Sequence, residues 1–432
     1  REPKVIDLFS DKRFGNRRDV SPTDNCRGTR TQSTRKEQYL LVSKGKTMRF
    51  KSVSSIHADP YRTGAEIGDA LREIVPEVIL LFASISYEQD FTDLFDGIRD
   101  SLGSTETLIF GGTGDGIYET SRVANYGVCA LGIHSGGKLR WSVAFEKGVS
   151  TDSYSAARSC ALKALSQIDG QAAFAFVLAD GTKADGSRIV AGVNSVLRIP
   201  YFGGLTGDDR KFTRSRVLLN GQELEDVVAI LVASGELSHS INAASGWSPI
   251  GTPGIIEECE GNSIRRISGV SAQTFMKEQL GKPLGETDLG IIPLAMYKSE
   301  GTEYFSLRTS SHLDSDAGAI TMFGSIDQGT PVRVCTATRE EIINSVSDAL
   351  EGLNRGKSGG AAAVVISCAG RKWLLEDRAN EEVEQVLATL GQRIPLVGFP
   401  SFGEISPFRK PDGTYSDTFF HNVTFVICAI GG

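Results

Sequence analysis

Three stretches of this chain repeat one unusual loop composition. "YFGGLTGDDR" spans residues 201–210, "FGGTGDGIY" spans 110–118 and "VGFPSFGEI" spans 397–405. Each combines glycines with an acidic residue and directly follows a short apolar run of strand length. In two cases the order strand, helix, strand, loop recurs, because "AAFAFVLAD" and "AAAVVISCAG" each precede a helical pattern upstream of the loop. This order predicts crossover units whose loops lie at the carboxyl ends of strands, where α/β sheets bind ligands.

The pattern predicts an α/β (mixed α+β) fold, with two related units of mixed β-sheet flanked by helices and glycine-rich loops at strand ends. We expect the first unit to cover residues 48–246 and the second 247–432, divided at the proline- and glycine-rich "SPIGTPG". Residues 1–47 show no hydrophobic period and are rich in Arg, Ser and Thr, so we expect a disordered basic tail there.

Several elements are predicted in detail. "PYRTGAEIGDALREIV" has the spacing of an amphipathic helix, and Thr338 with Glu341 forms a capping box that begins another. "ANYGVCALGIH" and "LRWSVAFEKG" are predicted to be neighbouring antiparallel strands. "VVAILVAS" and "INAASGW" are predicted to close the first unit, and "NVTFVICAI" is the predicted final strand.

Charge and composition exclude several classes of protein. The chain carries a formal net charge of -7, yet residues 1–47 hold an excess of basic residues, so the remaining body is strongly acidic. Nucleic acid binding needs Lys and Arg to replace counterions, so we expect no nucleic acid partner. No apolar run approaches the length of a membrane span, so no membrane insertion is expected. Seven scattered cysteines without a C-x-x-C pair indicate reduced thiols and a cytoplasmic protein without a zinc site.

The glycine loops have a binding and a structural interpretation. Glycine lets ligand atoms approach the backbone, and successive N–H groups in such a turn attract anions. Plain turns at strand ends are the alternative. Asp115, Asp208 and Glu404 each follow a loop glycine, and their carboxylates are predicted to bind either a ligand amine or their own backbone. No loop matches a Walker or dinucleotide-binding motif.

Charged and nucleophilic residues near the third loop suggest further roles. Arg371 is predicted to end a strand near Glu404, where its guanidinium would either clamp a ligand carboxylate or pair with Glu404. His421 opens the predicted final strand and is either a satisfied polar residue or an axial base for haem iron. Cys368 and Ser401 are candidate nucleophiles, but no general base is recognisable, so we expect no enzyme activity.

The succession "IPYFGGLTGDD", "CAGR", "PLVGFPSFGEISP" and "FHNVTF" resembles the FIST proteins, which are intracellular signal-transduction modules with paired FIST N and FIST C domains. The resemblance covers about residues 50–432 and makes 48–246 a FIST N-like domain and 247–432 a FIST C-like domain. It implies a sensory domain that binds a small ligand, for instance an amino acid or a related carboxylate. The first loop, "FGGTGDG", departs from the family wording "C-S-T-x-G-E".

The resemblance and the loop chemistry together give one main hypothesis. The chain is expected to be a stand-alone sensor that binds a small molecule and acts through a separate signalling protein, such as a kinase or a chemotaxis component. Two alternatives stay open: a haem-binding nitric oxide sensor that regulates a partner kinase, and a thiol-dependent enzyme that uses Cys368. No cofactor is expected, apart from haem in the first alternative. The candidate ligand-binding residues are Gly203, Gly204, Thr206, Gly207, Asp208, Cys368, Arg371, Phe399, Ser401, Gly403, Glu404, His421 and Asn422.

Overall fold

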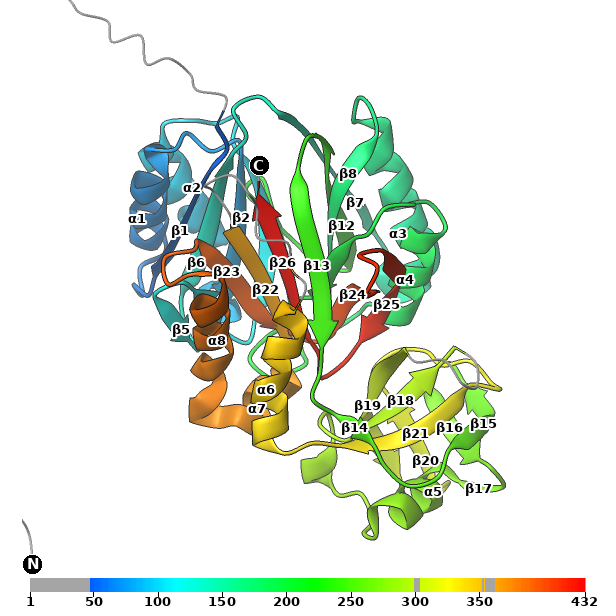
Figure 1. Cartoon of the computed structure of the whole chain (residues 1–432). Helices are drawn as coiled ribbons and strands as arrows, with labels where there is room; N and C mark the ends of the chain where they lie inside the picture. Colours follow the sequence, from blue (N-terminus) through cyan, green and yellow to red (C-terminus); the bar gives the residue numbers. More distant parts are fainter. Residues whose placement is uncertain (1–46, 299–303, 352, 354–361, 432) are drawn as a thin grey trace, which may run out of the picture. The chain divides into compact units, whose positions relative to one another are not determined.

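Three six-stranded sheets with the same internal strand order make up most of the structure (Figure 1). The structure is a computed structural model that describes residues 47–298, 304–351, 353 and 362–431, so the tail expected over 1–47 lies almost wholly outside the described residues. The chain contains three repeats, each with four main strands. In each sheet the first strand of the repeat pairs with the fourth, the fourth pairs antiparallel with the second, and the second pairs parallel with the third. The predicted mixed sheets are therefore confirmed.

The four strands that each repeat contributes follow in the order of pairing. The first sheet contains β1 (Arg49–Ser55), β6 (Val128–His134), β2 (Val78–Ser84) and β3 (Leu108–Gly114). The second contains β7 (Leu139–Lys147), β12 (Val227–Gly235), β8 (Ala172–Ala179) and β9 (Phe202–Leu205). The third contains β13 (Ser238–Ala244), β26 (Phe425–Gly431), β22 (Ala362–Cys368) and β23 (Leu396–Ser401). The internal duplication predicted from the sequence thus has a third copy in the N-terminal part of the chain.

Each repeat also contributes two further strands to the sheet of another repeat. After β3, the strands β4 (Ile117–Glu119) and β5 (Arg122–Ala124) extend the third sheet, where β4 pairs with β23. After β9, β10 (Val217–Leu219) and β11 (Gln222–Leu224) extend the first sheet at β3. After β23, β24 (Glu404–Arg409) and β25 (Tyr415–His421) extend the second sheet at β9. The glycine loops are therefore the points at which the chain passes from one sheet to another.

Helices cover the outer face of each sheet through apolar stripes. The first sheet carries α1 (Pro60–Arg72), η1 (Ile85–Tyr87) and α2 (Phe91–Leu102). The second sheet carries α3 (Val149–Ser166) and α4 (Gly186–Asn194). The third sheet is accompanied by α6 (Arg339–Leu350), α7 (Ala369–Leu375), η3 (Glu376–Ala379) and α8 (Asn380–Leu390). The predicted capping box is present, because Thr338 Oγ1 accepts from the Glu341 amide and the Glu341 carboxylate accepts from the Thr338 amide.

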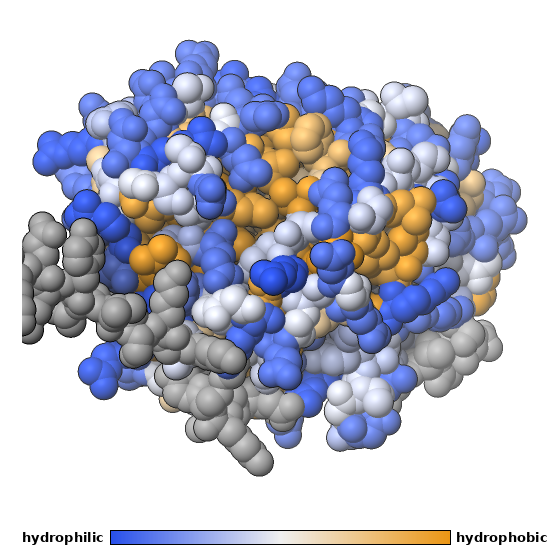
Figure 2. All heavy atoms as spheres, turned by 90° about the horizontal axis from the view of Figure 1, so that it is seen from above, coloured by the Kyte–Doolittle hydropathy of each residue, from blue (hydrophilic) through white to orange (hydrophobic). Residues whose placement is uncertain are grey.

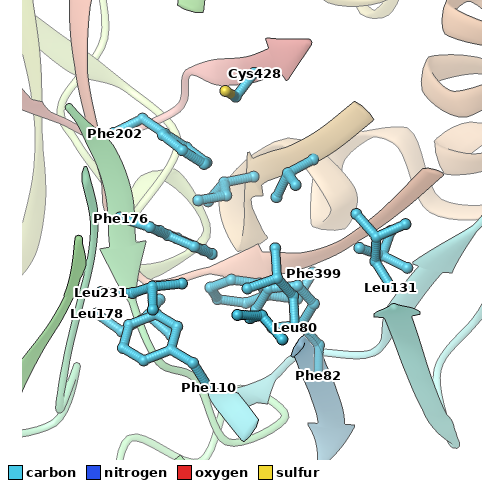
Figure 3. Close-up of a cluster of buried hydrophobic side chains, with 14 of the residues drawn as sticks. Leu80, Phe82, Phe110, Leu131, Phe176, Leu178, Phe202, Leu231, Phe399 and Cys428 are labelled. Atoms are coloured by element: carbon cyan, nitrogen blue, oxygen red, sulfur yellow. The ribbon is translucent and has the colours of Figure 1, made fainter. Parts of the chain in front are cut away.

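The inner faces of the three sheets share one apolar core. Figure 3 shows side chains from all three sheets pointing toward one another, with the ring of Phe82 stacked on Phe399 at 4.7 Å between centroids. The rings of Phe176 and Phe202 stack at 4.5 Å, and Phe110 meets Phe176 edge-on. Because the Phe82–Phe399 and Phe110–Phe176 contacts join different repeats, burying the core requires all three repeats together.

A further β-sheet, of eight strands, is inserted between β13 and α6. Its strands are β14 (Ser248–Pro249), β15 (Gly254–Glu260), β16 (Ser263–Ile267), β17 (Val270–Ser271), β18 (Pro293–Tyr297), β19 (Phe305–Asp314), β20 (Ala319–Met322) and β21 (Pro331–Thr336). The helix α5 (Ala272–Leu280) and the short η2 (Glu286–Asp288) complete the insertion, which encloses an apolar cluster of its own. We refer to residues 248–336 as the inserted sheet.

Figure 2 looks onto the end of the molecule at which β26 finishes, opposite the glycine loops. Hydrophobic residues are visible in the middle of this face, surrounded by hydrophilic ones. Across the described ranges, no helix has the length and apolar character needed to cross a membrane.

Two predictions about strand partners and one about a strand boundary are wrong. β6 and β7 are not neighbours, because β6 pairs with β1 and β2 whereas β7 pairs with β12. β13 does not complete a sheet of the N-terminal half, since it pairs with β26 near the C-terminus. His421 ends β25 and does not open the final strand, which begins at Phe425. In the first two cases the actual partner is distant in sequence, which a local hydrophobic pattern does not reveal.

Candidate functional site

The three glycine loops meet and hydrogen-bond to one another in a closed ring. Between the first two loops, the Gly207 amide donates to the carbonyl oxygen of Thr113 at 2.9 Å. The Leu205 amide donates to the Gly403 carbonyl at 2.8 Å and joins the second loop to the third. The Asp115 amide closes the ring by donating to the carbonyl of Pro400 at 3.1 Å. The structure therefore brings together loops that lie far apart in the sequence, as their position at strand ends predicts.

The glycines of these loops are required mainly by close packing. An added Cβ at Gly203 would lie 1.9 Å from the carbonyl oxygen of Val177 on the neighbouring parallel strand. Gly111 and Gly398 occupy the equivalent positions of the other two sheets and would clash in the same way at 1.7 and 1.9 Å. At Gly204 a Cβ would press on Ser401 and the Gly403 carbonyl of another repeat. These positions support the loop ring, and their backbones are not open to a ligand.

Asp208 shapes the loop that follows β9. It is fully buried, and its carboxylate accepts hydrogen bonds from the amides of Phe212, Thr213 and Arg214 at 2.7–2.9 Å. The loop contains non-glycine residues with positive φ, at Asp209, Arg210 and Phe212. Such strained conformations persist only where the surroundings fix them, and they concentrate at functional sites. Asp208 therefore holds a strained loop in place, which is the backbone-binding alternative that the sequence left open.

That loop presents an aromatic ring to a cavity of about 600 Å³. Phe212 is 42% exposed and stacks on Phe402 at 4.4 Å, with Phe323 of the inserted sheet stacked beside it at 5.6 Å. The cavity lies between the strand-end loops and the inserted sheet, which supply its two walls. Its lining consists of Gly181, Thr182, Lys183, Ala184, Asp185, Phe212, Asn262, Leu289, Gly290, Ser311, Met322, Phe323, Gly324 and Trp373.

None of the residues predicted from the sequence to bind ligand lines this cavity. Thr206, for instance, bonds instead to Ser215 in a buried network. The largest missed group is the segment 181–185, which follows β8 directly. The rule that ligands bind at the carboxyl ends of strands applies to this segment as well, so that signal was present in the sequence.

A second, polar hollow of about 400 Å³ adjoins Trp373, which lines both. Arg210 lies over the Trp373 ring at 4.0 Å, and the indole Nε1 donates to Asp115 at 3.2 Å. Burial raises the pKa of Asp115 to about 6, although nearby Lys372 opposes the shift. Burial also lowers the pKa of Lys372, whose ammonium contacts the Asp115 carbonyl. This hollow thus brings acidic and basic side chains together.

Glu404 is fully buried at the end of the third loop. Its carboxyl accepts from Ser401 Oγ at 2.5 Å and from the Thr424 amide at 3.1 Å, and burial raises its pKa to about 8. Burial also raises the pKa of Cys368 well above its ordinary value, so the thiol stays protonated at neutral pH. A protonated, buried thiol is a poor nucleophile, which weakens the thiol-dependent alternative.

The hypothesis that Arg371 pairs with Glu404 or clamps a ligand is wrong. Arg371 lies in α7 with no exposed surface, and its Nε donates to Glu382 of α8 at 2.8 Å. Its other nitrogens donate to the carbonyls of Ser245 and Ile342. The guanidinium therefore ties α6, α7 and the end of β13 together, and every one of its nitrogens has a protein partner.

His421 and Asn422 also have structural partners. The Nε2 of His421 lies 3.1 Å from the Ser406 carbonyl, and burial lowers its pKa to about 4. The hollow that it borders measures about 180 Å³, below the 300–1,000 Å³ of typical ligand pockets, so its surroundings do not fit haem. Asn422 joins the three six-stranded sheets to the inserted sheet. Its backbone N–H donates to the Leu307 carbonyl, and its side-chain Oδ1 accepts from the backbone N–H of Thr309.

The remaining predicted residues pack against these groups. Phe399 is buried against Phe82 in the shared core. A Cβ at Gly403 would collide with the ring of Phe420, and one at Gly207 would press on the Asp115 carboxylate. In the described part of the chain, no three His, Cys, Asp or Glu side chains are grouped so that they could hold a metal ion.

Comparison with known proteins agrees with the motif succession noted in the sequence. The FIST N domain model matches residues 77–270, and the FIST C domain model matches residues 264–407. FIST domains are associated with sensing in signal transduction. No curated protein matches the chain.

Some solved structures of proteins with other names are weakly similar to this chain. A cyanuric acid hydrolase from A. caulinodans is 8% identical with a TM-score of 0.36, over 89% of this chain and 99% of that one. A chorismatase is 9% identical with a TM-score of 0.30, over 89% of this chain and 98% of that one. Since the two family models together match most of the sequence, the chain belongs to the FIST family.

Proposed function

We propose that this protein is a non-catalytic sensor that binds a small ligand in the 600 Å³ cavity and acts through a separate signalling partner in the cytoplasm. The observation that carries the proposal is the position of the cavity. One wall comes from strand-end loops of the three-sheet body and the other from the inserted sheet. A ligand that touches both walls favours one arrangement of the two parts, and this differential contact is what a sensor requires.

The lining indicates the kind of ligand. Phe212, Phe323 and Trp373 supply apolar ring surface, while Lys183, Asn262 and Ser311 supply polar groups. A pocket of this volume with a few polar groups among aromatic side chains is typical of small-molecule sites. These groups suit a compact molecule with an apolar part and an acidic or hydrogen-bonding end, such as an amino acid or a related carboxylate.

The test is a ligand screen on a matched pair of variants. Ala184→Trp places an indole in the cavity, whereas Ala191→Trp adds the same side chain at an exposed position of α4. A saturating ligand, at 100 times its dissociation constant, stabilises the folded chain by about 2.7 kcal/mol. Amino acids and small carboxylates should therefore raise the melting temperature of the wild type and Ala191→Trp, and not that of Ala184→Trp. Equal responses in both variants would place ligand binding outside this cavity.

A further inference from the structure

Two buried polar side chains on β19 have atoms without a hydrogen-bond partner. Arg308 is 3% exposed, and its Nε and Nη1 atoms have no acceptor among the described residues. Ser310 is 1% exposed, and its Oγ also lacks a partner there. Because side chains two apart on a strand point to the same face, the free donors of Arg308 and Ser310 lie on one side of β19. Buried polar groups in native proteins are almost always paired, so two such groups together indicate a missing partner.

Two neighbouring carboxyl groups, Asp185 and Glu404, attract Arg308 from a distance, but neither is a direct partner of its guanidinium. Asp185 is already engaged, because its oxygens accept from the amides of Ser187, Arg188 and Ser325. Glu404 bonds to Ser401 and Thr424, and its raised pKa of about 8 leaves it mostly protonated at neutral pH. Within the described ranges, Arg308 forms no ion pair with either group. A buried charge without a directly bonded partner is costly, so a hydrogen-bonded partner of opposite charge would be favoured.

The contacts that Arg308 does make fix its position. Its Nη2 donates to Ser187 Oγ at 3.2 Å, and its guanidinium carbon lies 4.5 Å from the centre of the Phe420 ring. The ring is closely packed, since a Cβ at Gly186 or Gly403 would collide with it. The guanidinium is therefore preorganised at the junction between α4, β25 and the inserted sheet.

This junction adjoins the cavity. Ser310 pairs with Met322 across β19 and β20, and Met322 lines the cavity together with Ser311. Ser187, which accepts a hydrogen bond from Arg308, lies beside Asp185 and Gly324, and these two residues also line the cavity. The free donors thus lie directly behind one wall of the proposed ligand site.

We propose that Arg308 and Ser310 form a binding site for a small planar oxyanion, namely a carboxylate. The guanidinium would supply N–H donors and the counter-charge, and the Ser310 hydroxyl a further donor. If the carboxylate is part of a larger ligand, the assignment rests on the proposed ligand-binding function. A free carboxylate would occupy the site whether or not the cavity binds a ligand.

Formate tests the site directly, because it is the smallest carboxylate. Melting temperatures are measured during titration with sodium formate at constant ionic strength, with sodium chloride as the balance. The wild type should show a saturating rise, and Arg308→Met should show none. Ser310→Ala should weaken the apparent affinity by about tenfold, as expected for loss of a hydrogen bond to a charged group. Arg265→Met, at an exposed arginine of the same inserted sheet, is the matched control and should respond as the wild type does.

Benzoate distinguishes the two sources of the carboxylate. If the ligand is a cavity molecule with an acidic end, benzoate should bind more tightly than formate, and Ala184→Trp should remove that gain while the formate response persists. If the free anion is the ligand, formate and benzoate should bind with similar affinity, both in the wild type and in Ala184→Trp. Arg308→Met should fold at least as well as the wild type, because it removes an unpaired buried charge. A wild type that does not respond to formate, or a response that persists in Arg308→Met, would overturn the anion site, and the screen with Ala184→Trp would still decide the cavity function.

Discussion

Replacing Arg371 by Met should destabilise the fold and leave the ligand cavity intact. Neither Arg371 nor Glu382 has any exposed side-chain surface, and the two are joined at 2.8 Å. Removing one partner of a buried pair leaves the other charge uncompensated, which costs about 3–5 kcal/mol. Total stabilities of domains are about 5–15 kcal/mol, so a loss of this size is readily measured.

Urea unfolding followed by fluorescence measures the loss. Arg371→Met should lower the free energy of unfolding by about 4 kcal/mol, and the double variant Arg371→Met with Glu382→Gln should recover part of it, because the stranded charge is removed. Arg265→Met, which breaks an exposed pair with Glu260, should cost at most about 1 kcal/mol. If Arg371→Met unfolds at the same urea concentration as the wild type but no longer binds a cavity ligand, the structural role argued for Arg371 is refuted.

Two further predictions concern the glycine loops. Asp208→Ala should accelerate amide exchange at Phe212, Thr213 and Arg214 by at least about tenfold, because each amide loses a bond to a carboxylate. Hydrogen exchange read by mass spectrometry checks this, and unchanged exchange would mean that the loop is held by other contacts. Burial raises the pKa of Glu404 from 4.5 to about 8, so the folded chain keeps a proton that the unfolded chain releases. Stability should therefore fall as pH rises through that window, by at most about 1.4 kcal/mol per pH unit, and urea melts of Glu404→Gln should lack this slope. An equal slope in wild type and variant would show that Glu404 is ionised in the folded chain.

Local patterns in the sequence predicted the elements well and their partners poorly. The helix at residues 60–72 and the strand at 78–84 follow from hydrophobic spacing, which is a local property. The exchange of β4, β10 and β24 between sheets depends on contacts across most of the chain, and no local pattern encodes it. The misassignment of β6 and β7 has the same cause.

The candidate site shows a similar division. The loops were found because glycine and acidic residues at strand ends are visible in the sequence. The role of Arg371 was missed because its partner, Glu382, lies in an ordinary amphipathic helix pattern that does not show which acidic residue is buried. Arg308 lies in a strand without a recognisable motif, and its importance comes from its Nε and Nη1 atoms, which have no acceptor within the part of the chain that the structure describes.

The threefold use of one loop composition follows from the exchange of strands. Each loop leaves the third strand of its own sheet and enters another sheet, so it must cross the place where all three sheets converge. Within each sheet, the third strand also lies so close to its parallel neighbour that a Cβ at Gly111, Gly203 or Gly398 would collide with a carbonyl of that neighbour. The acidic residue after each loop then anchors backbone amides: Asp115 binds the Asp209 amide, Asp208 the loop at 212–214, and Glu404 the Thr424 amide. The repeated motif thus fixes the loops behind the cavity, whereas the cavity itself is lined by other side chains, such as Phe212, Trp373 and Lys183.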